Sequence, residues 1–287
     1  MGTFRLTKTI ESDGGRHLGD VLSSLSGLSR EQVDDALLKG ALWFQRRGRK
    51  AFRLRDPGFE LQRGDSLEFR YDEALLGLVP PRARCVADEQ RYSVWYKPPG
   101  LLTQGTRFGD HCTLLRQAEL HFRPPRPALP VHRLDREAAG LVLIAHDKGA
   151  AAALSGLLRK NAVRREYRAI LRGNIGQEGT CGTIDRPLDG KPAVTEFRVI
   201  ACDEKRQTSE VAILLRTGRR HQIRRHFDML GFPVMGDPRY GRGNKNREGL
   251  QLEASSLQFQ CPFTGHRKDY VAWPRKKPLD PSNATAL

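Results

Sequence analysis

Residues 132–145 read HRLDREAAGLVLIA and join a charged segment to an apolar one. The last six residues, Gly140–Ala145, are continuously apolar and bounded by polar residues, which is typical of a strand covered on both faces. Asp147 follows as a candidate helix cap, and the alanine-rich stretch to Leu158 forms the body of the expected helix. We therefore predict a buried central strand followed by a helix.

Asp135 stands just before this strand, between Arg133 and Arg136. Nearby guanidinium groups favour the ionised carboxylate, which is the form that a nucleophile needs. Asp135 could equally serve only to tie its arginine neighbours into a loop. The segment by itself leaves both interpretations open.

A second charged segment, residues 217–227 (TGRRHQIRRHF), follows the strand-like run Val211–Leu215. Ile223 and Phe227 recur in it at helical spacing, so we predict an amphipathic helix that ends at Gly231. Arg224 adjoins this apolar stripe, where a guanidinium group can reach a partly buried carboxylate.

The other arginines of this segment can face phosphate groups or simply be solvated. His221 and His226 lack the helical spacing of a zinc pair and have no third ligand nearby in the sequence. The five cysteines are scattered and form no C-x-x-C pattern, which argues against both a zinc module and a disulfide framework.

Charge is distributed unevenly along the chain. Its 287 residues include 49 Lys and Arg against 33 Asp and Glu, a formal net charge of +16. Residues 1–80 hold 13 basic and 12 acidic residues, so nearly all of the excess lies in residues 81–287. A basic surface attracts polyanions, and nucleic acid is the leading partner.

Membranes are the rival partner for a basic protein. No apolar run approaches the ~18 residues that a spanning helix requires, and the first residues lack the apolar region of a signal peptide. We therefore expect a cytoplasmic protein that does not enter the membrane.

The first 80 residues predict a small domain of two short helices and a sheet. Ser29 and Gln32 form a capping-box pattern before the second helix, and Gly40 marks its end. A basic cluster follows within residues 46–55, where it could form a phosphate-facing loop or a solvated hairpin. Its first members are Arg46, Arg47, Arg49 and Lys50.

Four segments together resemble the RluA family of pseudouridine synthases. They are YKPPGLLTQG (96–105), HRLDREAAGLVLIA (132–145), RREYRAILRG (164–173) and TGRRHQIRRHFDMLGFPVMGDPRYG (217–241). They occur in the family's order and span most of residues 90–245. The resemblance implies an α+β catalytic domain over residues 81–287, with a mixed, largely antiparallel central sheet flanked by helices and loops. We expect a mobile tail from about residue 274.

Residues 1–80 resemble in part a small α+β RNA-binding domain first seen in a ribosomal small-subunit protein. The matching stretch is LSREQVDDALLKG, at residues 28–40. The usual Arg-Leu-Asp opening is replaced by Arg16-His17-Leu18-Gly19-Asp20, so the match is incomplete.

The family resemblance also implies roles for single residues. Asp135 matches the catalytic nucleophile, Tyr167 matches an aromatic that packs against the target base and can help to deprotonate C5, and Arg224 matches the partner of the aspartate. Arg133 matches a residue that fills the gap left by a flipped-out uridine. The family's Thr-Ser pair is replaced by Ala138-Ala139, which removes two hydroxyl groups. Further residues expected to contact RNA are His132, Arg136, Lys97, Arg219 and Arg220, together with Arg46, Arg47, Arg49 and Lys50.

The reaction that the resemblance implies is the isomerisation of uridine to pseudouridine. It involves no redox change and no group donor, so we expect neither a cofactor nor a metal. The expected partner is structured RNA, with ribosomal RNA favoured over tRNA and no required protein partner evident, and the target base should be flipped out of its stack.

Two other functions stay open at this stage. The chain could be an RNA-binding or ribosome-assembly protein of the same fold with impaired catalysis. It could also be a base-excising glycosidase, in which Glu137 would act as the second carboxyl group.

Overall fold

A computed structural model describes residues 2–11 and 17–272. The chain divides into two compact units, Met1–Pro81 with Leu102–His121, and Arg82–Leu101 with Phe122–Leu287. The first break lies next to the predicted domain boundary at residue 80. Residues 102–121, however, belong to the smaller unit, whereas the sequence assigned them to the larger domain. The tail expected from about residue 274 lies outside the described residues.

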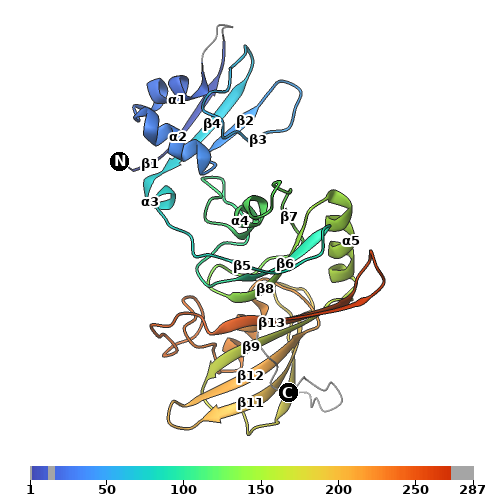
Figure 1. Ribbon diagram of the computed structural model, residues 1–287. Coiled ribbons are helices and arrows are strands. Elements are labelled where there is room, and N and C mark those ends of the chain that lie inside the picture. The colour runs from blue at the N-terminus through green and yellow to red at the C-terminus, as the bar shows by residue number, and fades with distance from the viewer. Residues whose placement is uncertain (1, 12–16, 273–287) are drawn as a thin grey trace. The chain divides into compact units, whose positions relative to one another are not determined.

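The smaller unit is built on an antiparallel sheet in the order β1-β4-β2-β3 (Figure 1). Leu18, Leu22 and Leu37, from its first two helices, are fully buried in one apolar core with Phe69. The capping box predicted from Ser29 and Gln32 is present. The elements are β1 (Thr3–Thr9), α1 (Leu18–Ser26), α2 (Arg30–Leu38), β2 (Leu42–Gln45), β3 (Phe52–Arg53), β4 (Ser66–Asp72), α3 (Glu73–Leu76) and α4 (Leu114–His121).

The larger unit contains a mixed sheet of ten strands in the order β10-β11-β12-β9-β13-β8-β6-β5, with β14 paired to β13 and β7 to β8. Among the described strands, only β13 and β8 pair in parallel. This sheet confirms the expected mixed, largely antiparallel arrangement. The strands are β5 (Arg84–Asp88), β6 (Tyr92–Lys97), β7 (Leu129–Pro130), β8 (Ala139–Ala145), β9 (Arg164–Arg172), β10 (Cys181–Asp185), β11 (Val194–Asp203), β12 (Thr208–Leu215), β13 (Leu252–Gln260) and β14 (Arg267–Val271).

The central strand β8 is the apolar run identified in the sequence. From Gly140 to Ala145 every residue is buried, as a strand covered on both faces requires. Helix α5 (Lys148–Arg159) follows, and the Asp147 side chain caps it by accepting a hydrogen bond from the Ala150 N–H at 2.8 Å. Ala150 and Leu154 of this helix pack into the same core as Leu141 and Leu143 of β8.

Gly140 determines how closely β8 and β13 approach. Its φ is +117°, and a Cβ atom there would lie 2.4 Å from both the backbone nitrogen and the carbonyl oxygen of Ala254. Only glycine tolerates both conditions. On its other side, Ala254 pairs with Tyr167 of β9. The start of β8 and Tyr167 therefore lie on the two sides of β13.

The second helix of the larger unit, α6 (Gln222–Met229), packs on β11, where Phe227 stacks edge-on with Phe197. The sequence predicted this helix from Ile223 and Phe227, and both side chains are buried. No helix in the described part of the chain is long and apolar enough to cross a membrane.

Candidate active site

Asp135 and Arg224, which are 89 residues apart in the sequence, form the centre of the site. Arg224 Nη1 donates to Asp135 Oδ2 at 2.7 Å. The Arg224 side chain is 3% exposed and that of Asp135 is 21% exposed, so the carboxylate retains access to solvent while its partner does not. The structure thus brings together the two residues that the resemblance paired.

A second carboxylate, Asp237, holds the other side of the same guanidinium group. Arg224 Nε and Nη2 donate to its two oxygens, each at 2.7 Å, and the Asp237 side chain has no exposed surface. Burial disfavours both charges, but these hydrogen bonds outweigh it: the pKa of Asp237 is lowered and the pKa of Arg224 is raised from their ordinary values. Arg224 is therefore a fixed cation.

No role was predicted for Asp237 from the sequence. It lies in the turn after Gly236, where its Oδ1 atom also accepts the backbone N–H groups of Arg239 and Tyr240 at 2.8 and 3.0 Å. A lone aspartate in a Gly-Asp-Pro turn normally indicates only turn chemistry. Its pairing with Arg224 depends on the fold and has no local signal.

His221 lies on the remaining side of Asp135, at the N-terminal end of α6. Its Nε2 atom is 3.5 Å from Asp135 Oδ1, and its Nδ1 atom is 2.9 Å from the hydroxyl oxygen of Tyr240. Burial lowers the pKa of His221, although the charge of Asp135 acts in the opposite direction. His221 was noted in the sequence only as an unsuitable zinc ligand, and Tyr240 had no assigned role.

The N-terminal end of α6 is fixed by Gln222, which is 3% exposed. Its Oε1 atom accepts from the Thr217 hydroxyl at 2.8 Å and from the Arg219 N–H at 2.9 Å. Its Nε2 atom donates to the Val194 carbonyl and the Thr195 hydroxyl of β11. Two of these bonds close the turn before α6, and the other two tie the start of the helix to the first residues of β11.

Tyr167 comes from β9 and is 9% exposed. Burial raises its pKa, Arg165 opposes the rise and the charge of Asp135 adds to it. The side chain is therefore a neutral phenol at neutral pH. That state suits packing against a base, but it gives no support to the expected help in C5 deprotonation, which needs a proton acceptor.

Arg165 lies on the same face of β9 as Tyr167, because the two are two residues apart in a strand. Its buried Nε atom has no hydrogen-bond partner in the described structure. A Cβ atom on Gly218 would come within 3.0 Å of its guanidinium group, so the glycine provides the room that Arg165 occupies. A half-buried cation thus lies on the face of β9 that carries Tyr167.

Lys97 differs from its predicted role. The residue has no exposed surface, and its ammonium group donates to the carbonyls of Pro98, Leu101 and Arg136 at 3.0, 2.8 and 3.2 Å. Burial lowers its pKa to about 8. Lys97 therefore braces the backbone next to Asp135 and is not available to contact RNA.

His132 also has an internal partner, since its Nε2 atom accepts the backbone N–H of Leu143 at 3.0 Å. Burial, with a contribution from Arg165, lowers its pKa to about 4, so the ring is neutral. Arg133 and Arg136 next to it are exposed. The structure leaves these two arginines accessible to RNA, whereas His132 fixes the loop.

Glu137 pairs with its neighbour, because Arg136 Nε lies 3.2 Å from Glu137 Oε1. The Ala138 N–H donates to the Asp135 carbonyl, so this segment turns and is not the extended chain that would align Glu137 with Asp135. Ala138 is buried in that turn, and its backbone closes the turn without a side-chain hydroxyl.

Beyond the centre, Arg219 and Arg220 are exposed, and Arg219 Nε donates to the Pro192 carbonyl at 2.9 Å. Arg225 makes a bidentate pair with Asp189 at 2.8 and 3.0 Å, and the Asp189 side chain is 72% exposed. The start of α6 therefore presents several cations toward solvent around the buried Arg224.

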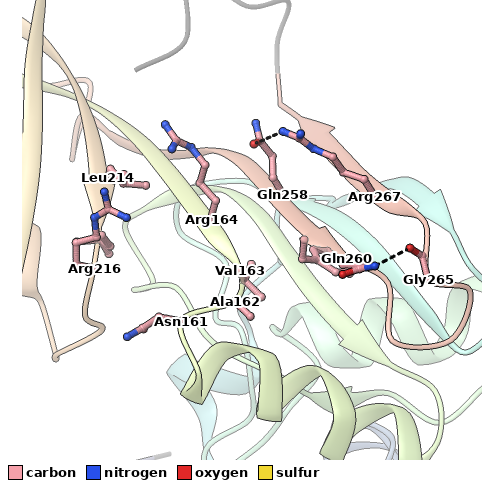
Figure 2. A pocket seen from close by; sticks show the side chains of 12 residues that line it. Asn161, Ala162, Val163, Arg164, Leu214, Arg216, Gln258, Gln260, Gly265 and Arg267 are labelled. Atoms are coloured by element: carbon pink, nitrogen blue, oxygen red, sulfur yellow. Dashed lines mark hydrogen bonds between the residues drawn. The ribbon is translucent and has the colours of Figure 1, made fainter. Parts of the chain in front are cut away.

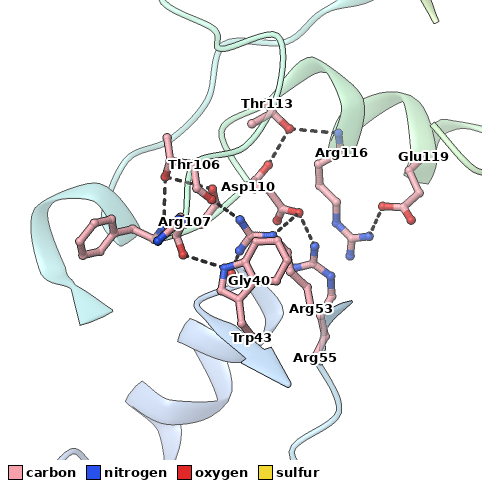
Figure 3. Close-up of polar contacts among 12 residues, drawn as sticks. Gly40, Trp43, Arg53, Arg55, Thr106, Arg107, Asp110, Thr113, Arg116 and Glu119 are labelled. Atoms are coloured by element: carbon pink, nitrogen blue, oxygen red, sulfur yellow. Dashed lines mark hydrogen bonds and ion pairs between the residues drawn. The ribbon is translucent and has the colours of Figure 1, made fainter. Parts of the chain in front are cut away.

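The basic cluster of the smaller unit separates into two groups. Arg46 donates to both oxygens of the buried Asp65, at 2.9 and 2.8 Å, whereas Arg47, Arg49 and Lys50 are exposed. Arg53 and Arg55 reach Asp110 of the 102–121 segment, with the shortest contact 2.6 Å from Arg55 (Figure 3). Only the exposed group can meet a phosphate without breaking an internal ion pair.

Trp43 strengthens this attachment, because its indole N–H donates to the Arg107 carbonyl at 3.1 Å (Figure 3). Arg53 also lies over the Trp43 ring, 4.6 Å from its centre. These contacts explain why residues 102–121 belong to the smaller unit.

A cavity of about 510 Å³ lies on the other face of the large sheet (Figure 2). Its lining includes Arg164, Arg216 and Arg267, and Arg267 donates to the Gln258 side chain at 3.4 Å. Arg164 and Tyr167 are three residues apart on β9, so their side chains point to opposite faces. This basic cavity is separate from the Asp135 site. Among the described residues, no cluster of His, Cys, Asp and Glu is suited to hold a metal ion.

Comparison with known proteins shows which family the chain resembles. The profile of the family described as RNA pseudouridylate synthase matches residues 91–229, a range that contains Asp135, Tyr167 and Arg224. The RNA pseudouridine synthase YlyB of Bacillus subtilis is 35% identical over 205 residues, which cover 65% of each chain. YhcT of the same organism is 34% identical over 58% of this chain and 61% of its own, so the match spans less than two thirds of either relative.

A longer match is found with the ribosomal large subunit pseudouridine synthase D of Zymomonas mobilis, at 27% identity over 95% of this chain and 94% of the relative. The fold is that of solved structures of human RNA pseudouridylate synthase domain containing 1 and 4. The first has a TM-score of 0.55 and is 23% identical, covering 72% of this chain and 89% of its own. The second has a TM-score of 0.54 and is 22% identical, covering 67% of this chain and 88% of its own. The chain has the pseudouridine synthase fold, and over residues 91–229 it is similar to the RNA pseudouridylate synthase family.

Proposed function

We propose that this protein is an RNA pseudouridine synthase that isomerises uridines in structured RNA, with large-subunit ribosomal RNA as the favoured substrate. The observation that carries the proposal is the Asp135 carboxylate, partly exposed and held at 2.7 Å by a buried arginine inside the segment that matches the family. The choice of ribosomal RNA rests on the name of the Zymomonas relative.

In the proposed reaction, Asp135 attacks C1′ of the uridine as the N1–C1′ bond breaks. The released uracil turns in the site, C5 bonds to C1′ and the aspartate leaves. The proton on C5 is lost and N1 gains one, so substrate and product have the same composition. A carboxylate suits both steps, because it is a nucleophile when ionised and a leaving group when esterified.

The surrounding residues support this scheme by holding the reacting groups. Arg224 fixes the carboxylate by donating to its Oδ2 atom at 2.7 Å. Tyr167, as a neutral buried phenol, would pack against the uracil ring and keep it in the site while it turns. The exposed Arg133 next to Asp135 would occupy the place that a flipped-out uridine leaves in the RNA, at an unstacking cost of about a few kcal/mol.

The basic surface would bind the RNA backbone. The larger unit carries most of the positive charge, and exposed Arg136, Arg219 and Arg220 flank the site. In the smaller unit we propose an RNA-binding role for Arg47, Arg49 and Lys50. We place the protein in the cytoplasm, where its substrate would be found.

The test uses ribosomal RNA and tRNA from a strain that lacks this protein. Each RNA is incubated with the purified protein, and pseudouridine is mapped by chemical modification. A new site in ribosomal RNA that disappears with Asp135→Asn and persists with Glu137→Gln is the expected result. RNA binding without any new site would favour a binding protein, an abasic product lost with Glu137→Gln would favour a glycosidase, and a new site only in tRNA would overturn the preferred substrate.

A further inference from the structure

His221 has an uncommon backbone conformation for its residue type. Its φ and ψ are 52° and 30°, in the left-handed region, directly before the first residue of α6. A residue with a side chain is strained there, and such residues concentrate at functional sites. In this structure the conformation places the imidazole between Asp135 and Tyr240.

The contacts of Asp135 divide its two oxygens between two partners from one turn of the chain. Oδ2 accepts from Arg224 at 2.7 Å, and Oδ1 lies 3.5 Å from His221 Nε2. Arg224 uses two further N–H groups to hold Asp237, and its bond to Asp135 is to Oδ2 alone. The contact to Oδ1 comes from His221.

Tyr240 contacts the nitrogen of His221 that faces away from Asp135. Its hydroxyl lies 2.9 Å from His221 Nδ1, and the two rings meet edge to face with centres 5.6 Å apart. When the Tyr240 O–H donates to Nδ1, the neutral imidazole must carry its proton on Nε2, which faces Asp135. The opposite tautomer would direct a lone pair at the carboxylate.

We propose that the Tyr240–His221 pair is a positioning device for Asp135: its Nε2–H orients Oδ1 for attack without neutralising the carboxylate, and protonation of the imidazole turns the reaction down. The inference rests on the proposed function, since it assigns a role beside the nucleophile. His221 is a positioning residue, because it acts on the substrate only through Asp135.

The charges around His221 explain why the neutral form is the working one. Asp135 attracts a proton to the ring, whereas Arg224 from α6, Arg220 from the preceding turn and Arg239 from the turn beside Tyr240 oppose it. Burial acts in the same direction as the arginines. A second cation at 3.5 Å would pair with Asp135 and make it a poorer nucleophile. Turnover should therefore fall as the pH drops through the range in which His221 is protonated.

The test measures turnover between pH 5 and 8 as tritium released from C5 of [5-³H]uridine-labelled ribosomal RNA, taken from the strain that lacks this protein. His221→Asn removes the imidazole while keeping a residue that accepts the left-handed conformation. Tyr240→Phe removes one hydroxyl. Tyr270→Phe, which removes a buried hydroxyl near Tyr92 and Glu89, is the matched control.

We expect His221→Asn to lower kcat about 10-fold at pH 7.5, the effect of about one hydrogen bond, with KM unchanged and with the acidic fall in kcat abolished. Tyr240→Phe should lower kcat by a similar factor and add nothing to His221→Asn in the double variant. Tyr270→Phe should behave as wild type. If His221→Asn failed to fold, Tyr240→Phe alone would decide, since loss of the fixed tautomer must lower kcat at constant KM.

An unchanged pH profile in His221→Asn, or additive losses in the double variant, would overturn the inference while leaving the synthase intact. Absence of tritium release from the wild-type protein, with no difference from Asp135→Asn, would instead overturn the proposed function. The two failures are therefore distinct.

Discussion

Asp237→Asn should be among the most damaging conservative substitutions in this protein, and its neighbour provides the control. Arg224 and Arg225 are adjacent on α6, and each makes a bidentate pair with an aspartate: Arg224 with the fully buried Asp237, and Arg225 with Asp189, whose side chain is 72% exposed. Asparagine is nearly the same size as aspartate, so both substitutions remove a charge and little volume.

The expected magnitudes differ because of burial. Breaking a buried ion pair costs about 3–5 kcal/mol, and here it leaves the buried Arg224 with the partly exposed Asp135 as its carboxylate partner, whereas an exposed pair is worth about 0.2–1 kcal/mol. For a unit of this size the first loss corresponds to a fall in Tm of about 6–20 °C, and the second to a few degrees at most. Asp189 has a φ of 52°, a conformation that asparagine also tolerates, so the control introduces no backbone strain.

Thermal unfolding of both variants at pH 7 measures the difference. The pKa of Asp237 is lowered in the folded protein, so its contribution is present above the unfolded pKa of ~3.9 and is lost only as the pH falls through the folded value. The deficit of Asp237→Asn should therefore be constant from pH 7 to about 5. Equal Tm shifts for Asp237→Asn and Asp189→Asn would refute the view that Arg224 depends on Asp237.

Three further predictions concern other parts of the chain. Because burial lowers the pKa of Lys97 to about 8, the unfolded chain binds more protons than the folded protein between about pH 8 and 10.4. The free energy of unfolding of the wild type, measured in urea, should therefore rise with pH across this range by up to about 3 kcal/mol relative to that of Lys97→Met. Parallel pH dependences of the two proteins would contradict this. Gly140→Ala should cost about 2–5 kcal/mol from strain and overpacking, whereas Gly190→Ala, whose Cβ would meet nothing within 4 Å, should cost less than half as much in the same denaturation experiment. Arg47→Ala and Lys50→Ala should each reduce the slope of log affinity for ribosomal RNA against log salt by about 1, and an unchanged slope would place the RNA elsewhere.

Elements with a strong local pattern could be predicted from the sequence. The apolar run of β8, the Asp147 cap of α5 and the Ser29 capping box each lie within a few residues, and the structure contains all three. Strand β1 was not predicted, although Phe4 and Leu6 alternate with polar residues as in a half-buried strand. A short alternating run beside the chain terminus is a weak signal until its partner, β4, is known.

The pairing of charges could be predicted only in part. Arg224 was expected near a carboxylate because it borders an apolar stripe, but the same stripe says nothing about which carboxylate. Asp237, Asp65 and Asp110 each bind an arginine that is between 13 and 57 residues away in the chain. Sequence patterns report period and composition, whereas these pairs depend on which loops the fold brings together.

Asp237 and Asp135 have different roles because they bind different nitrogens of the Arg224 guanidinium group. Had Arg224 bound Asp135 through both nitrogens, it would have covered both carboxylate oxygens and neutralised the group. Because Asp237 accepts from Nε and Nη2, Asp135 accepts a single hydrogen bond, from Nη1, and two carboxylates share one guanidinium group. Asp237 thus supplies the stability that a buried arginine requires, and Asp135 stays oriented and incompletely paired, as a nucleophile must be.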